Sequence, residues 1–201
     1  MESIWGKGED ITLNILQKQK LTGNWLDLGA GDGRYVSDLL KQVSHLVVSD
    51  INKVELHKLQ SRLSEKEKSK ISEKIFDMTK KFPFMDSIFD GVFCTGTLHL
   101  FTIEQISFIF SEIGRVLKPQ GKLIVDFATD IKRFSKGKKV SFNDTINYTS
   151  AEAKNILLKM LVNYPVEIIQ SSFEDNVTGN DSYGFQKSKG NFFLIVGNKK
   201  L

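Results

Sequence analysis

The side chains with the clearest chemical potential are two aspartates and three glycines in the first quarter of the chain. Gly29, Gly31 and Gly33 follow an apolar run that contains Asp27, and a helical apolar pattern follows them. This succession predicts a buried strand, a glycine turn and the start of a helix. Gly29 lets the chain reverse sharply, and Gly31 removes the Cβ that would keep a ligand away from the backbone. The turn is therefore predicted to hold a ligand.

The charges around this turn indicate which ligand. In a dinucleotide site the turn faces a pyrophosphate, and the third glycine lies three residues after the second. Here Gly33 comes earlier, and the Asp27 carboxylate at the end of the strand would repel a phosphate. The next apolar run ends in Asp50, whose carboxylate can accept hydrogen bonds from both hydroxyls of a ribose. A nucleoside with an ammonium and a sulfonium but no phosphate satisfies both acids, which describes S-adenosylmethionine (SAM).

Residues 27–33, followed by Asp50, resemble the cofactor motif of class I SAM-dependent methyltransferases. Residues 83–94 and 115–122 are similar to a branch of that family with many small-molecule methyltransferases, the type 11 or ubiquinone/menaquinone-biosynthesis-like branch. The resemblance covers roughly residues 20 to 127 and departs from the family at Gln120, where glycine is usual. It implies methyl transfer from SAM to a small molecule, with S-adenosylhomocysteine (SAH) as product.

The residues predicted to bind the cofactor follow the first four predicted strands. They are Asp27, Gly29, Ala30, Gly31, Asp50, Ile51, Asp77, Met78 and Thr95. Asp27 would bind the methionine amino group and Asp50 the ribose. The resemblance implies that Asp77 holds the adenine amino group and that Met78 offers a backbone amide, although Asp77 could instead cap the following turn. Thr95 follows the fourth strand, whose end should face the transferable methyl group.

Candidates for the acceptor side lie in three stretches. His99 follows the fourth strand, and its ordinary pKa suits a catalytic general base, with orientation of the acceptor from a buried position as the alternative role. Trp5, beside a glycine, could fold over the cofactor or pack against the domain surface. Five basic residues between 132 and 139 are expected in a loop over the active-site side, with Arg133 predicted to contact the acceptor. Such a loop attracts an anionic acceptor, or is simply solvated.

The composition limits the possible domain organisation, metal sites and partners. The chain has 201 residues, 40% of them hydrophobic and 26% charged, which suits a single globular domain with a real core. One cysteine and three histidines predict no internal disulfide and no metal site. No signal peptide or spanning segment is recognisable, so we expect a cytoplasmic protein. The net charge of +4 favours nucleic acid only weakly, and it does not indicate an oligomeric state.

The order of apolar patterns predicts an α/β fold. We expect a Rossmann-like, doubly wound sheet of seven strands, mostly parallel with the last strand antiparallel, and helices on both faces. Capping boxes at Thr102 and Thr149 predict the starts of two helices. The fifth strand is expected over residues 122–127. Residues 1–201 would form one methyltransferase domain, with an N-terminal segment over 1–20 and an insertion over 128–150 on the active-site side.

Three other functions stay open at this point. An RNA or protein methyltransferase would use the basic residues 132–139. A nicotinamide-dependent oxidoreductase is disfavoured by Asp27 and by the glycine spacing. A non-catalytic protein could retain the fold and sense the cofactor. Cytosine-C5 methylation is excluded, because that chemistry needs a nucleophilic cysteine that usually follows a proline, and Cys94 follows Phe93.

Overall fold

The computed structural model describes residue 3 and residues 11–141, 146–177 and 184–201, so Trp5 lies outside the described residues. The helices and strands alternate along most of the chain, as in other α/β folds. In order they are α1 (Ile11–Lys18), β1 (Asn24–Leu28), α2 (Val36–Leu40), β2 (His45–Asp50), α3 (Lys53–Arg62), α4 (Glu65–Lys68), β3 (Ile71–Ile75), β4 (Phe89–Cys94), η1 (Leu98–Leu100), α5 (Ile103–Val116), β5 (Leu117–Ser135), β6 (Lys138–Val140), α6 (Ser150–Met160), β7 (Val166–Asn176) and β8 (Lys187–Asn198).

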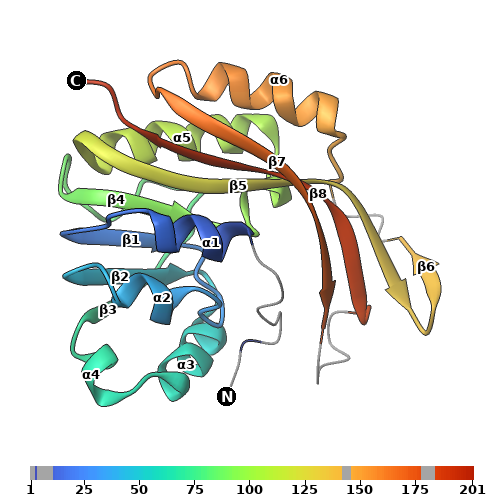
Figure 1. The fold of residues 1–201 in the computed structure, drawn as a ribbon, viewed down its shortest axis with the longest axis horizontal. Helices are drawn as coiled ribbons and strands as arrows, with labels where there is room; N and C mark the ends of the chain where they lie inside the picture. Colours follow the sequence, from blue (N-terminus) through green and yellow to red (C-terminus); the bar gives the residue numbers. More distant parts are fainter. Residues whose placement is uncertain (1–2, 4–10, 142–145, 178–183) are drawn as a thin grey trace.

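The strands form one sheet in the order β3-β2-β1-β4-β5-β8-β7, with β6 paired to β5 off this path (Figure 1). The first five strands of that order are parallel, and β8 is antiparallel to both β5 and β7. The predicted doubly wound sheet with an antiparallel last strand is confirmed, and β6 adds an eighth strand. Strand order reverses between β1 and β4, and ligands of such sheets bind at the carboxyl ends of the strands there.

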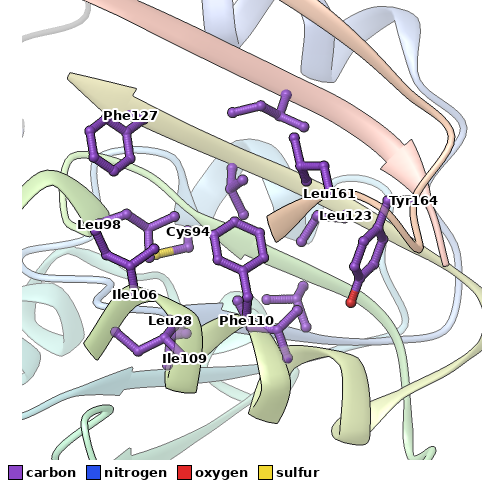
Figure 2. Packing of buried hydrophobic residues seen from close by; sticks show 14 of the residues in the cluster. Leu28, Cys94, Leu98, Ile106, Ile109, Phe110, Leu123, Phe127, Leu161 and Tyr164 are labelled. Carbon is purple, nitrogen blue, oxygen red and sulfur yellow. The ribbon is translucent and has the colours of Figure 1, made fainter. Parts of the chain in front are cut away.

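Helices cover both faces of the sheet. α1, α2 and α3 bury apolar side chains on one face, among them Leu16, Val36, Leu39, Leu56 and Leu59. α5 and α6 cover the other face, and α5 presents apolar residues at helical spacing to it. Figure 2 shows Ile106, Ile109 and Phe110 of α5 within the same core as Leu123 and Phe127 of β5. These two cores hold the strand ends of β1, β2 and β4 in fixed positions.

Both predicted capping boxes are present. The Thr102 hydroxyl accepts a hydrogen bond from the Gln105 amide, and the Gln105 side chain accepts one from the Thr102 amide. Thr149 and Glu152 make the same reciprocal pair at the start of α6. Each box satisfies two backbone donors that the first turn of a helix leaves unpaired, so α5 and α6 begin where the sequence predicts.

The prediction of where the fifth strand begins and ends is wrong, because β5 runs from Leu117 to Ser135. The strand was predicted over residues 122–127, whereas β5 continues to Ser135. β4 ends at Cys94, opposite Val125, so the rest of β5 passes beyond the ends of the parallel strands. It stays extended because it pairs with β8 as far as Phe134, across an irregularity after Thr129, and then with β6.

Two neighbouring strands continue past the same edge. We call residues 129–135 of β5, β6, residues 171–176 of β7 and residues 187–191 of β8 the extension. In Figure 1 these parts of β5, β7 and β8 bend away from the ends of β1 and β4. Lys136 and Gly137, both with positive φ, form the tight turn between β5 and β6. The basic residues expected in a loop therefore lie on a hairpin of the sheet.

Candidate functional site

The glycine loop between β1 and α2 is fixed to the end of β2. The amides of Gly29 and Ala30 both donate to the Ser49 carbonyl, at 2.9 and 2.8 Å. The Gly31 amide donates to the Asp50 carboxylate at 2.9 Å, and the Asn52 amide donates to the other oxygen of that carboxylate at 2.8 Å. The loop and Asp50, which the sequence analysis assigned to one ligand, are thus in direct contact.

Two glycines of the loop are needed for different reasons. Gly29 has a φ of +74°, and a Cβ there would lie 2.8 Å from the Thr97 hydroxyl and 3.1 Å from the Met78 methyl group. Gly31 has a φ of +54°, and a Cβ there would meet nothing within 4 Å. Glycine at position 29 therefore permits packing against protein, whereas the space at position 31 is open to a ligand.

The Asp27 carboxylate is buried without a cation. Its side chain is 4% exposed, and among the described residues it has no ion-pair partner. Burial, with the charge of Asp50 as the smaller cause, raises the pKa of Asp27 to about 8. Asp32, in the glycine loop and equally buried, is paired with Arg62 at 2.9 Å. The fold thus pairs the buried Asp32 with a cation and leaves Asp27 of β1 without one among the described residues.

A third acid joins this edge of the sheet. Asp126 of β5 accepts a hydrogen bond from the Gly96 amide at 2.7 Å. Burial first, and then the charges of Asp126, Asp27 and Asp50, raises the pKa of the Cys94 thiol well above its ordinary value. The ends of β1, β2, β4 and β5 therefore form a region of negative potential. This arrangement suits a cation and disfavours a phosphate.

The sequence analysis did not select Asp126 or Thr97. Thr97 donates a hydrogen bond to the Thr95 carbonyl at 3.0 Å and reaches the Gly29 carbonyl at 3.5 Å. It thereby places the loop after β4, with the half-buried Thr95, against the glycine loop. A signal for Asp126 exists in the sequence, because a carboxylate between Val125 and Phe127 interrupts an otherwise apolar strand.

The end of β3 supplies the remaining predicted cofactor residues. Asp77 accepts hydrogen bonds from the amide and the hydroxyl of Thr79, at 2.8 and 2.7 Å, and these bonds lower its pKa. The turn-capping role left open for Asp77 is therefore present, and one carboxylate oxygen has no such bond. Met78 is buried beside Gly29, and Ile51 is 67% exposed next to Asp50. Ile51 thus offers an exposed apolar surface beside the Asp50 carboxylate.

Comparisons with known proteins agree with this geometry. The sequence model described as "methyltransferase domain" matches residues 26–125, which contain the glycine loop, Asp50, Asp77 and β4. The chain belongs to this family of methyltransferase domains. No curated protein sequence matches the chain.

Solved structures share the fold over most of the chain. The YcgJ protein of Bacillus subtilis has a TM-score of 0.68 at 15% identity, covering 94% of this chain and 98% of that one. The S-adenosylmethionine dependent methyltransferase of Mesorhizobium loti has a TM-score of 0.65 at 14% identity, covering 98% and 100%. The DhpI–SAH complex has a TM-score of 0.62 at 14% identity, covering 94% and 82%. At such identities the likeness shows the fold alone, a Rossmann-like α/β domain.

His99 and Arg133 interact electrostatically in the structure. His99 lies in η1, directly after the β4 loop, and is 8% exposed. Its Nδ1 is buried and has no hydrogen-bond partner among the described residues. Burial, and to a lesser extent the charge of Arg133, lowers the pKa of His99 to about 4. The imidazole is therefore neutral at pH 7, and Arg133 is its nearest cationic influence.

Arg133 belongs to a row of side chains on one face of the extension. It is the register partner of Ser188, which is also the partner of Asp175. Directly paired residues of antiparallel strands project from the same face. Asp175 forms an ion pair at 3.2 Å with Arg34, which follows the glycine loop. This face of the extension is thus tied, through Asp175 and Arg34, to the segment that follows the glycine loop.

Lys132 and Lys139 project from the opposite face, whereas Lys138, the partner of Ser135, lies on the face of Arg133. Lys132 pairs with Lys189, and Phe134 pairs with Lys139 and Lys187. Because side chains alternate along a strand, these residues point away from the Arg133 row. The prediction that the basic stretch as a whole lies in a loop over the active site is therefore wrong, since pairing with β8 and β6 divides it between two faces.

Three further observations concern other features of the described residues. A hollow lined by Lys20, Asp90, Lys118 and Gln120, among others, lies at the amino ends of the parallel strands, opposite the glycine loop. Within the described ranges, no three or more His, Cys, Asp or Glu side chains gather as metal ligands would. None of the helices described is both long enough and apolar enough to cross a membrane.

Proposed function

We propose that the protein is a SAM-dependent methyltransferase that acts on a small-molecule acceptor. The observation that carries this proposal is the buried, unpaired Asp27 in a region shared with Asp50 and Asp126. Burial keeps this acid mostly protonated in the unliganded protein, and a cationic ligand beside it would favour its ionised form. The ammonium and sulfonium of SAM supply two such charges, whereas the pyrophosphate of a nicotinamide cofactor would add negative charge to an acidic region.

The remaining cofactor residues fit the same ligand. Asp50 would accept from the ribose hydroxyls, and the open space at Gly31 admits the cofactor next to the backbone. Ile51 would contact the adenine ring, with Asp77 and the Met78 amide at its polar edge. Thr95 would lie near the sulfonium. SAM bound here supplies an activated methyl group, and the DhpI–SAH complex has the same fold.

The chain's own contribution to catalysis is alignment of the acceptor with the methyl group and exclusion of water. His99 and Arg133 would contact the acceptor, a role supported by their position beyond Thr95 at the carboxyl edge of the sheet. An imidazole with a pKa of about 4 is a weak base at pH 7. We therefore assign His99 to orient the acceptor, with proton removal as a secondary role for acceptors that are already acidic.

Thermal unfolding in the presence of SAM, SAH and NAD tests the cofactor assignment. A ligand at one hundred times its Kd should add about 2.7 kcal/mol of stability. We expect stabilisation by SAM and SAH but not by NAD. Asp50→Ala should abolish the shift, whereas the control Asp90→Asn, at the opposite edge of the sheet, should leave the ligand-induced increment unchanged.

Stabilisation by NAD alone would overturn the proposal. If SAH binds, methyl transfer is tested by incubating the protein with SAM and acceptor panels and measuring SAH formation. A protein that binds SAH but transfers no methyl group to any small molecule would favour the cofactor-sensing alternative.

A further inference from the structure

We propose that Arg133 and His99 together bind an oxyanion of the methyl acceptor, a carboxylate or a phosphate, on the face of the extension that carries Arg133 and Asp175. This inference rests on the proposed function and specifies the class of acceptor. It is carried by three features of the described residues: a buried polar atom of His99 without a partner, an Arg133 guanidinium that packs on an aromatic ring and whose charge acts on that histidine, and the position of Lys132 on the opposite face of β5.

The Nδ1 atom of His99 is the unsatisfied group. Buried nitrogen and oxygen atoms nearly always have hydrogen-bond partners, so an exception needs an explanation. His99 follows β4 directly, at the edge of the sheet where the substrates of this fold bind. A neutral imidazole can donate from Nδ1 to an anion. A ligand oxygen at this position would satisfy the atom that the protein leaves unpaired.

Arg133 is held in place by its surroundings. Its guanidinium carbon lies 5.4 Å from the centre of the Phe185 ring. The Phe185 segment is fixed in turn, because Gln186 donates to the Phe134 carbonyl at 2.9 Å and accepts from the Lys136 amide at 2.8 Å. Burial lowers the pKa of Arg133, and its charge in turn lowers that of His99. A planar guanidinium fixed in a partly dry setting is the preferred partner of a carboxylate or phosphate.

An oxyanion would reverse an unfavourable interaction. Without one, the charge of Arg133 acts against protonation of His99. With one, both side chains face a negative group, and proton binding to His99 becomes more favourable. The site then has opposite charges at its two ends, with Asp27 and Asp126 toward the cationic cofactor and Arg133 toward the acceptor.

Lys132 provides a matched control, since Lys132 and Arg133 are adjacent but project from opposite faces of β5. The experiment follows the His99 ring resonances by NMR in the SAH-saturated protein during titration with inorganic phosphate and, separately, with acetate. The chain has three histidines, so the signals lost in His45→Gln and in His57→Gln identify those two rings, and the remaining set belongs to His99. We expect a saturable shift and a higher His99 pKa in the wild type and in Lys132→Gln.

In Arg133→Gln we expect at least tenfold weaker binding of the same anion, because a charge-assisted bond is lost, with partial recovery in Arg133→Lys. The stronger of the two probes distinguishes a phosphate acceptor from a carboxylate acceptor. The absence of a saturable shift in the wild type would overturn the inference, as would equal losses in Lys132→Gln and Arg133→Gln. SAH binding, measured by calorimetry on the same samples, separates the two proposals, since its failure would overturn the proposed function itself.

Discussion

Asp27 of β1 interacts with Asp50, the last residue of the neighbouring parallel strand β2, and the charge of Asp50 favours the protonated form of Asp27. Asp50 is held by two backbone amides, whereas Asp27 is buried among apolar strands, where its pKa rises to about 8. Because burial disfavours the charged form, Asp27 is mostly protonated at neutral pH in the unliganded protein.

This difference predicts pH-dependent cofactor binding. Below pH 8 the unliganded protein carries a neutral Asp27, and the cofactor ammonium favours the ionised form. SAH binding should therefore release close to one proton at pH 7, and affinity should fall as the pH decreases from 8 to 6. Calorimetry in buffers of different ionisation enthalpy measures the proton release. Binding without proton release would contradict the assignment of Asp27, and Asp27→Asn should bind weakly at every pH.

The same acid should influence stability in the absence of ligand. The unfolded chain ionises Asp27 near pH 3.8, and the native state retains the proton up to about pH 8. Between these values the native state binds more protons, so the contribution of Asp27 to stability decreases as the pH rises, by at most about 1.4 kcal/mol per pH unit. Asp27→Asn should lack this decrease. Urea unfolding of both proteins at pH 5 and pH 8 checks it, and parallel pH profiles would contradict the prediction.

The ion pair between Arg34 and Asp175 predicts coupling between the cofactor loop and the extension. Both side chains are partly buried, and the pair joins residues that are far apart in the sequence. Removal of either partner should loosen the extension, with a coupling energy of about 0.5–1 kcal/mol in a double-mutant cycle with Arg34→Gln and Asp175→Asn. Hydrogen exchange should be faster for the amides of β7 and β8 near Asp175. Unchanged exchange there would show that strand pairing alone holds the extension.

Gln120 predicts a stabilising substitution. The family resemblance departs at this residue, which has a φ of +62°, where glycine is favoured. Gln120→Gly should raise the free energy of unfolding by up to about 1 kcal/mol, because a non-glycine residue with positive φ is strained. At the next position a Cβ would lie 2.9 Å from the Lys118 carbonyl, so the control Gly121→Ala should destabilise the protein. Chemical denaturation of both variants measures the difference. A stability loss in Gln120→Gly would show that the Gln120 side chain contributes more than the strain costs.

The sequence determined the parts of this protein that depend on neighbours along the chain. The glycine turn after Asp27, the acid that ends β2 and the capping boxes of α5 and α6 are local patterns, and each has one structural solution. The order of apolar runs also fixed the doubly wound sheet, since parallel strands joined by helices fold in few ways. Residue types alone indicated a cationic nucleoside as the ligand.

Only the tertiary structure decided what depends on pairing between distant strands. The continuation of β5 past Phe127 requires β8, more than fifty residues later in the chain. That pairing sets the register, and because side chains alternate along a strand, Arg133 and Lys132 then lie on opposite faces of the extension. The burial of His99 and the meeting of Asp126 with Gly96 arise in the same way. A sequence pattern shows which residues carry charge, whereas long-range register determines the face on which each charge lies.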